Sequence, residues 1–220
     1  MTREELIANV ALKMDEISSS DDVIVSVNAS DNNPLYTQIN GFINESVNDV
    51  LTKAPIYRIK NQIEAMNLAP SDYAEETIIG TFRKKVVIDV PNDFIRLVSI
   101  TDSLFQRPIV DLAVEGDNVD KQQHNKALIA KTAKPVAVIG RDIYGGRTIS
   151  CYSYSATDTP SPNMIYVKRY DNSLDLSEDT GLDEYITDIV SWACAGKVFA
   201  SRGDVNNGKI CDENAMALMV

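Results

Sequence analysis

The pattern of apolar and polar positions divides the chain into three parts. Residues 1–75 and 173–220 carry apolar side chains at the three- and four-residue spacing of amphipathic helices. Residues 76–172 instead hold short runs rich in Val, Ile, Phe and Tyr, separated by Pro, Gly, Asn and Asp, which is typical of strands and turns. The pattern therefore predicts an α+β fold, in which the N- and C-terminal helices form a bundle with an inserted antiparallel β-sheet.

We expect residues 1–220 to form a single domain, because neither helical part alone is long enough to bury a good core. In the first part, the apolar spacing predicts helices over residues 2–17 and 34–52, and the stripe continues from Ile56 to Asn67. Thr2 and Glu5 have the spacing of a capping box, which marks the start of the first helix.

Two polar segments have no clear periodicity. Residues 18–33 are expected to form a loop around the β-prone run Val23–Val27, which is either a short strand or an arm that becomes ordered only against a neighbouring molecule. Residues 115–126 are polar and irregular.

The clearest β pattern runs from Val86 to Ile100. It predicts a strand over 86–90, a turn at Pro91–Asp93 and a second strand over 94–101. Ile78, Ile79 and Phe82 are expected to lead into the first of these strands. Further strands are predicted over residues 106–112, 134–140 and 164–170, and a hairpin over 142–152. The tip of this hairpin, where two glycines can take positive φ, is a candidate contact site made of Tyr144, Gly145, Gly146 and Arg147.

The last part begins with a strongly periodic helix over residues 182–199. Its small residues at Ala193–Gly196 would let a second helix approach closely. The chain then ends on an apolar segment with two interpretations: a last helix packed on its own bundle, or a tail that docks into a groove of a partner. The candidate docking residues are Ile210, Met216, Leu218, Met219 and Val220.

Composition narrows the function classes. The chain is 44% hydrophobic and 24% charged, values at which a packed core is expected. A formal charge of −11 argues against a surface that wraps DNA or RNA, which needs clustered Lys and Arg. The same charge is compatible with a wall past which DNA slides without binding. We expect no secretory signal and no membrane span, because no apolar run approaches the ~20 residues that a bilayer requires.

The sequence contains no catalytic motif, and we expect neither a cofactor nor a metal. Cys151, Cys194 and Cys211 are widely spaced and odd in number, which indicates free thiols. The single histidine, His124, lies among polar residues and is expected to be a solvated loop residue. The acidic residues 171–184 lack the ligand spacing of an EF-hand and suit the start of a helix better.

The basic and aromatic clusters also have structural interpretations. Arg83–Lys85 and Lys168–Arg169 are expected to be strand-edge residues or ion-pair partners. Four tyrosines alternate along two predicted strands and are expected in the core or a subunit interface. They are Tyr152, Tyr154, Tyr166 and Tyr170.

Two motifs and the order of elements resemble the head-to-tail connector, or adaptor, proteins of short-tailed phages, also called tail tubular or ring proteins. The first is Val90-Pro-Asn-Asp-Phe-Ile-Arg-Leu97, and the second is the helix Asp183 to Phe199, with its small residues and aromatics. Among these proteins the ring proteins of crAss-like phage tails are the nearest association. Residues 18–33 and 115–126 depart from a minimal adaptor and leave extra contacts open.

The resemblance implies a structural virion protein and not an enzyme. Such a protein would form a dodecameric ring below the portal, assembled in the host cytoplasm, with the C-terminal tail reaching the portal and the β-insert facing outward or toward the next tail component. DNA would pass through the ring without specific binding. The alternatives from other classes are a tail-associated carbohydrate-active or accessory protein, and a binding module that uses the sheet edge.

Overall fold

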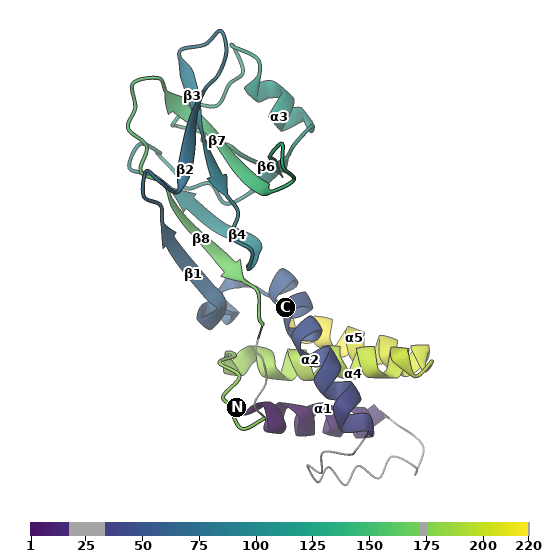
Figure 1. The fold of residues 1–220 in the computed structure, drawn as a ribbon. Helices are drawn as coiled ribbons and strands as arrows, with labels where there is room; N and C mark the ends of the chain where they lie inside the picture. The colour runs from purple at the N-terminus through teal and green to yellow at the C-terminus, as the bar shows by residue number, and fades with distance from the viewer. Residues whose placement is uncertain (18–33, 172–175, 220) are drawn as a thin grey trace. The chain divides into compact units, whose positions relative to one another are not determined.

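The computed structural model describes residues 1–17, 34–171 and 176–219, and the chain in it forms two compact units. The helical unit consists of residues 1–62 and 169–220, and the β unit of residues 63–168. Helices thus stand at both ends of the chain with sheets between them, which confirms the predicted α+β class (Figure 1). None of the described helices is both long and apolar enough to cross a membrane. Residues 18–33 and their predicted strand or arm lie outside the described residues.

The helical unit is organised around α4. Its described α-helices are α1 (Arg3–Ile17), α2 (Pro34–Lys53), α4 (Glu184–Ser201) and α5 (Val205–Met219). Helix α4 packs against the other three, and eleven of its 18 residues are buried. A helix that is apolar on most of its circumference is stable only when neighbours cover it, so α4 takes the centre.

Helices α4 and α5 meet at two glycines. A Cβ built on Gly196 would lie 3.2 Å from the carbonyl oxygen of Gly208 and 2.8 Å from Oδ1 of Asp212. The backbones are therefore too close for a larger side chain, which confirms the close approach predicted from the small residues of α4.

We expect Gly196→Val to lower the free energy of unfolding of the helical unit by ~1–3 kcal/mol, because the added carbons would push α5 away from α4. Urea unfolding followed by helical circular dichroism measures the change. Gly41→Ala is the matched control in α2, since a Cβ there meets nothing within 4 Å. It should raise stability by up to ~1 kcal/mol. A Gly196→Val protein as stable as wild type would contradict the packing.

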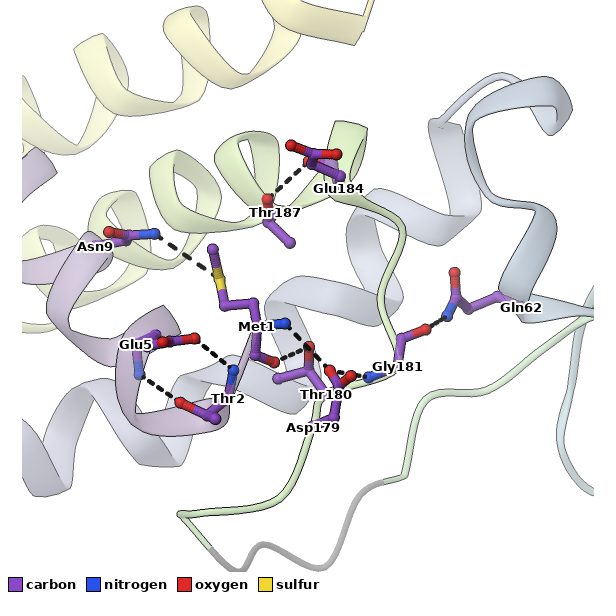
Figure 2. A network of polar contacts seen from close by, with 10 residues as sticks. All are labelled: Met1, Thr2, Glu5, Asn9, Gln62, Asp179, Thr180, Gly181, Glu184 and Thr187. Carbon is purple, nitrogen blue, oxygen red and sulfur yellow. Dashed lines mark hydrogen bonds and ion pairs between the residues drawn. The ribbon is translucent and has the colours of Figure 1, made fainter.

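The start of the chain is tied into the helical unit by a network of polar contacts (Figure 2). Thr2 N–H donates to the Glu5 carboxylate at 2.8 Å, and Glu5 N–H donates to Thr2 Oγ1 at 3.2 Å, so the predicted capping box is confirmed. The Met1 carbonyl accepts from the backbone N–H and from the hydroxyl of Thr180, each at 3.0 Å. These bonds join α1 to the segment that leads into α4.

The helical stripe from Ile56 to Asn67, which left two or three helices open for the first part, does not form a third helix. Instead of a helix from Ile56 to Asn67, the chain makes two short 3-10 turns, Ile56–Arg58 and Lys60–Gln62, followed by β1 (Ile63–Asn67). Strand β1 pairs antiparallel with β8 (Asn163–Lys168), a partner about one hundred residues away. This long-range pairing overrides the local helical spacing. Strand pairing accordingly begins at residue 63, not in the predicted 76–172 insert.

The β unit contains two sheets where one was expected. The first has the order β1-β8-β4, with β4 at Phe94–Thr101. The second has the order β2-β3-β7-β6-β5, and its strands are β2 (Tyr73–Thr77), β3 (Arg83–Asp89), β7 (Arg147–Ser155), β6 (Ala137–Arg141) and β5 (Leu112–Val114). All pairs are antiparallel except β5 with β6. The Pro91–Asp93 turn therefore carries the chain from one sheet to the other.

The two sheets share one hydrophobic core. Val86 and Ile149 from the five-stranded sheet pack in the same cluster as Ile100 and Met164 from the three-stranded sheet. The four tyrosines of the alternating pattern are all buried, which confirms their expected place in a core. Strand β5 starts later than predicted, and the polar stretch that follows it forms the short helix α3 (Asn118–Gln123).

Candidate functional site

One face of the five-stranded sheet carries a hollow of about 430 Å³, which we call the sheet-face pocket. Strands β2, β3, β6 and β7 form its floor, and α3 with the residues before it forms one wall. It gathers eight titratable side chains from segments that lie far apart in the sequence. They are Glu76, Lys85, Glu115, Asp120, His124, Arg141, Asp142 and Tyr152.

Tyr152 lines this pocket with Thr148 and Ser150, because alternate residues of a strand share one face, and a β-bulge lies directly beside it. The register of β3 and β7 shifts between Lys84 and Val86, so that Tyr152 and Ser153 together oppose Lys85. Val136 on the neighbouring chain segment holds the bulge, because its N–H donates to Ser153 Oγ at 3.1 Å and its carbonyl accepts from Tyr152 N–H at 3.0 Å. Bulges commonly re-aim a side chain near a functional site, which makes the pocket a candidate.

The carboxylates of the pocket and Lys85 already have partners within the fold. Lys85 Nζ lies 3.0 Å from the Glu76 carboxylate. Asp120 Oδ2 accepts from Gly116 N–H at 2.9 Å, and Glu115 Oε2 accepts from the backbone N–H of Arg141 at 3.2 Å. These carboxylates hold loops in place. These contacts stabilise the fold.

The phenol of Tyr152 is a neutral hydrogen-bond donor. Burial, followed by the nearby carboxylates Asp120, Glu115 and Glu76, raises its pKa to about 12. The ring lies 6.2 Å from that of His124, whose Nε2 is 3.6 Å from Asp120. His124 caps α3 and its side chain is 64% exposed, so the expected solvent contact is confirmed, although it stands at a helix end and not in a loop.

The thiols Cys151, Cys194 and Cys211 are free and buried. Burial raises the pKa of each to about 12. The thiolate is the reactive form, and it is scarce at any pH well below that value. Within the described parts of the chain, no group of three or more His, Cys, Asp and Glu side chains could hold a metal ion.

We expect the native protein to resist thiol reagents at pH 8, because the three sulfurs are both inaccessible and protonated. Titration with Ellman's reagent measures this, and the same sample in guanidinium serves as the control, where all three thiols should react. Rapid reaction of one thiol in the native protein would show that its environment is open.

The basic clusters are ion-paired on the strands. Lys84 Nζ lies 2.6 Å from Glu75, and Lys168 Nζ lies 3.2 Å from Glu64. With the Lys85–Glu76 pair these contacts confirm the expected role as ion-pair partners. Strand β3 lies inside its sheet, so its lysines do not protect an edge.

The predicted hairpin tip has the expected geometry. Asp142 Oδ1 accepts from the N–H groups of Tyr144 at 2.8 Å and Gly146 at 2.7 Å, and Gly145 has a φ of 88°. Ile143 and Tyr144 are each 90% exposed. This tip therefore offers two large apolar side chains to a partner.

A second exposed tip was not expected from the sequence, which treated its apolar residues as the approach to a strand. Ile79 and Phe82, in the turn between β2 and β3, are 97% and 92% exposed. Because Arg83 pairs with Ser155 while Asp89 pairs with Thr148, this turn and the 142–146 tip lie at opposite ends of the same sheet. The cue in the sequence is Gly80, which stands between the apolar pair Ile78–Ile79 and Phe82.

The predicted C-terminal docking residues lie on α5, which packs against α4 through Gly208, Cys211 and Ala215. The Arg58 guanidinium donates to the carbonyl of Leu218, so the end of the helix is bonded to its own unit. Three apolar side chains nevertheless remain exposed, and Met219 is half-buried. The exposed ones are Ile210, Met216 and Leu218. Val220 lies outside the described residues, and docking by this face stays a prediction.

A scan of protein-family models finds no match to this chain, and a search of curated proteins finds no significant similarity. What can be inferred about function therefore comes from the surfaces and contacts described above.

Proposed function

We propose that the protein is a structural virion component that forms a connector or adaptor ring between the portal and the tail of a short-tailed phage. The observation that carries the proposal is the pair of apolar hairpin tips, Ile79 with Phe82 and Ile143 with Tyr144, at opposite ends of one sheet. Each tip groups two large exposed apolar side chains, and grouped exposed apolar side chains are a mark of protein–protein contact sites. Two such tips give each subunit contacts in two directions.

The helical unit adds further apolar surface. Besides the outer face of α5, Leu12 on α1 and Tyr185 on α4 are exposed. In the proposed ring these helices pack from subunit to subunit, and the end of α5 lies toward the portal. The resemblance of the Val90–Leu97 and Asp183–Phe199 motifs to connector proteins supports the same arrangement.

The charge distribution supports a channel wall and not a DNA-binding surface. The chain has a formal charge of −11, and Lys84, Lys85 and Lys168 are engaged by carboxylates. Lysines paired in this way release few counterions from DNA and contribute little affinity. DNA would therefore pass a ring of these subunits without being held.

The alternative of a carbohydrate-active or accessory protein rests on the sheet-face pocket. It has weaker support, because Asp120 and Glu115 bond to backbone N–H groups and the Tyr152 phenol is held neutral. We accordingly propose no catalytic role for the protein.

We expect native mass spectrometry to find a closed oligomer, either of the chain alone or after mixing with portal rings. Replacing both tips, by Ile79→Ser with Phe82→Ser and by Ile143→Ser with Tyr144→Ser, should reduce assembly at least tenfold while the circular dichroism spectrum stays unchanged, since these side chains lie outside the core. Leu128→Ser, at another exposed apolar position, is the matched control and should assemble normally. A protein that stays monomeric at every concentration and never joins a portal would refute the proposal.

A further inference from the structure

A groove of about 610 Å³ runs along the outer edge of the five-stranded sheet. It is lined mainly by apolar side chains from the segment before β5, from β5 itself and from the segment before β6. Those used below are Pro108, Val110, Leu112, Val119 and Pro135. Val110 is 55% exposed and Val119 is exposed as well, so the groove is open to solvent.

At one residue beside the groove, Leu112, the backbone N–H and C=O are available for pairing with another strand. Glu115 N–H donates to the Ile139 carbonyl, which turns Glu115 toward β6, whereas both backbone groups of Val114 bond to Asp117 on the outer side. Leu112, two residues before Val114, directs its own N–H and C=O to the same outer edge. Beyond the β5–β6 pairing, no hydrogen bond within the described residues engages those two groups. An extended segment could pair with them.

Positive charge gathers at one end of the groove. Gln106 N–H donates to the Thr132 carbonyl at 3.0 Å, which brings Arg107 beside the loop that carries Lys131 and Lys134. All three cations are exposed, and none takes part in an ion pair with a described residue. Two carboxylates also line the groove. Asp117 is already engaged as the N-cap of α3, where it accepts from the Asp120 N–H, and Asp111 directly precedes β5.

We propose that residues 21–27 of a second copy of this chain dock in this groove as an added strand. The run Asp21-Asp-Val-Ile-Val-Ser-Val27 places two carboxylates directly before four β-branched apolar side chains. Such residues are suited to pairing at a sheet edge, with alternate side chains entering the apolar groove. The carboxylates complement the three cations at its end.

The length of the surrounding chain permits an exchange between copies. Residues 18–33 join α1 to α2, and sixteen extended residues span at most ~55 Å. Pairing with the N–H and C=O of a single residue, Leu112, gives modest affinity for a free peptide. Tethering in an oligomer raises the effective concentration of the segment, so a weak contact becomes a persistent one. The inference rests on the proposed ring in this respect, because the docked segment would form a contact between neighbouring subunits of that ring.

The first test measures binding of a fluorescent peptide of residues 18–33 to the full chain by anisotropy. The chain carries Val25→Pro, which keeps its own segment from competing. Lys131→Glu with Lys134→Glu should weaken binding at least tenfold, as should Asp21→Lys with Asp22→Lys in the peptide, and combining the two reversals should restore it. Lys131 and Lys134 are exposed, so the chain that carries their reversal is expected to fold. Absence of peptide binding, or reversals that do not compensate, would overturn the proposal.

A second test locates the segment. Protein with Ser26→Cys, mixed under oxidising conditions with protein carrying Val110→Cys, should form a disulfide-linked dimer. Ala74→Cys, exposed on the opposite edge strand β2, is the matched control and should not, and the native thiols are buried. Equal cross-linking at both edges, or none, counts against the groove. A ring that forms without peptide binding would overturn this inference alone, whereas peptide binding to a chain that never forms a ring would overturn the proposed function.

Discussion

Arg3→Met is expected to lower the free energy of unfolding of the helical unit by ~2–4 kcal/mol, because it removes a charged donor from two asparagine side chains. The Arg3 side chain is fully buried. Its guanidinium donates to Asn40 Oδ1 at 2.6 Å, to Asn44 Oδ1 at 3.1 Å and to the Asn40 carbonyl at 2.9 Å. Met fills similar volume but donates no hydrogen bond, so the Asn40 and Asn44 side chains lose the guanidinium as a partner, and losing a partner inside a protein costs ~1–3 kcal/mol for each group.

Two further variants separate these bonds from simple packing. Burial lowers the pKa of Arg3, because loss of solvent disfavours its charged form, and Tyr170 offsets part of this shift. Arg3→Lys keeps the charge but cannot reproduce the fork of donors, and should lose about half as much stability as Arg3→Met. Lys209→Met, exposed on α5, should change stability by less than ~0.5 kcal/mol. Urea unfolding read at 222 nm compares them. An Arg3→Met protein as stable as the Lys209→Met protein would contradict this account.

The partners of Arg3 illustrate what the sequence could and could not predict. The apolar spacing predicted α1 and α2 correctly, because helix periodicity is a local property. The polar ladder of Asn40, Asn44 and Asn48 on α2 was missed, although asparagines four residues apart on one helix face are visible in the sequence. Asn48 bonds to both backbone groups of Tyr170, across 122 residues. The spacing could have revealed the ladder, but not its partners.

The errors in the β region have the same origin. Residues 63–67 have helical apolar spacing, yet they pair with β8, and no local signal reports a partner so distant along the chain. The strand over 94–101 was predicted with its observed bounds, because Pro91 and the apolar run that follows it define it locally. Local signals were therefore enough to predict most of the helices and strands, while the division into two sheets depended on pairings between remote segments.

The candidate surfaces also differ in whether local sequence signals could predict them. The hairpin tip with Tyr144 was predicted because two adjacent glycines between apolar runs form a strong local turn signal. Ile79 and Phe82 were read as part of the approach to a strand, since hydropathy alone does not distinguish an apolar residue in a core from one at a tip. The sheet-face pocket combines residues of four strands and α3, and this combination depends on the pairing of strands that are remote in the sequence.

Asp102→Ala is expected to lower the stability of the β unit by ~3–5 kcal/mol, the other large effect. Asp102 follows β4 and is buried, and its carboxylate accepts from the Tyr154 hydroxyl at 3.1 Å, from Ser161 N–H at 2.7 Å and from Leu104 N–H at 2.9 Å. Tyr154 belongs to the other sheet, so the carboxylate joins the two sheets at the edge of their common core. Alanine leaves three donors unpaired, each at ~1–3 kcal/mol.

The hydrogen bond to Tyr154 can be separated from the others by a double-mutant cycle. Burial, with contributions from Cys151 and Asp102, raises the pKa of the Tyr154 phenol, so it remains a neutral donor throughout the stable pH range. Tyr154→Phe should cost ~1–2 kcal/mol alone but much less in the Asp102→Ala background, because the bond it removes is already gone. Asp89→Ala, exposed at the end of β3, is the matched control and should change stability by less than ~0.5 kcal/mol. Additive losses in the cycle would mean that Tyr154 stabilises the β unit through packing and that Asp102 acts through the loop N–H groups instead.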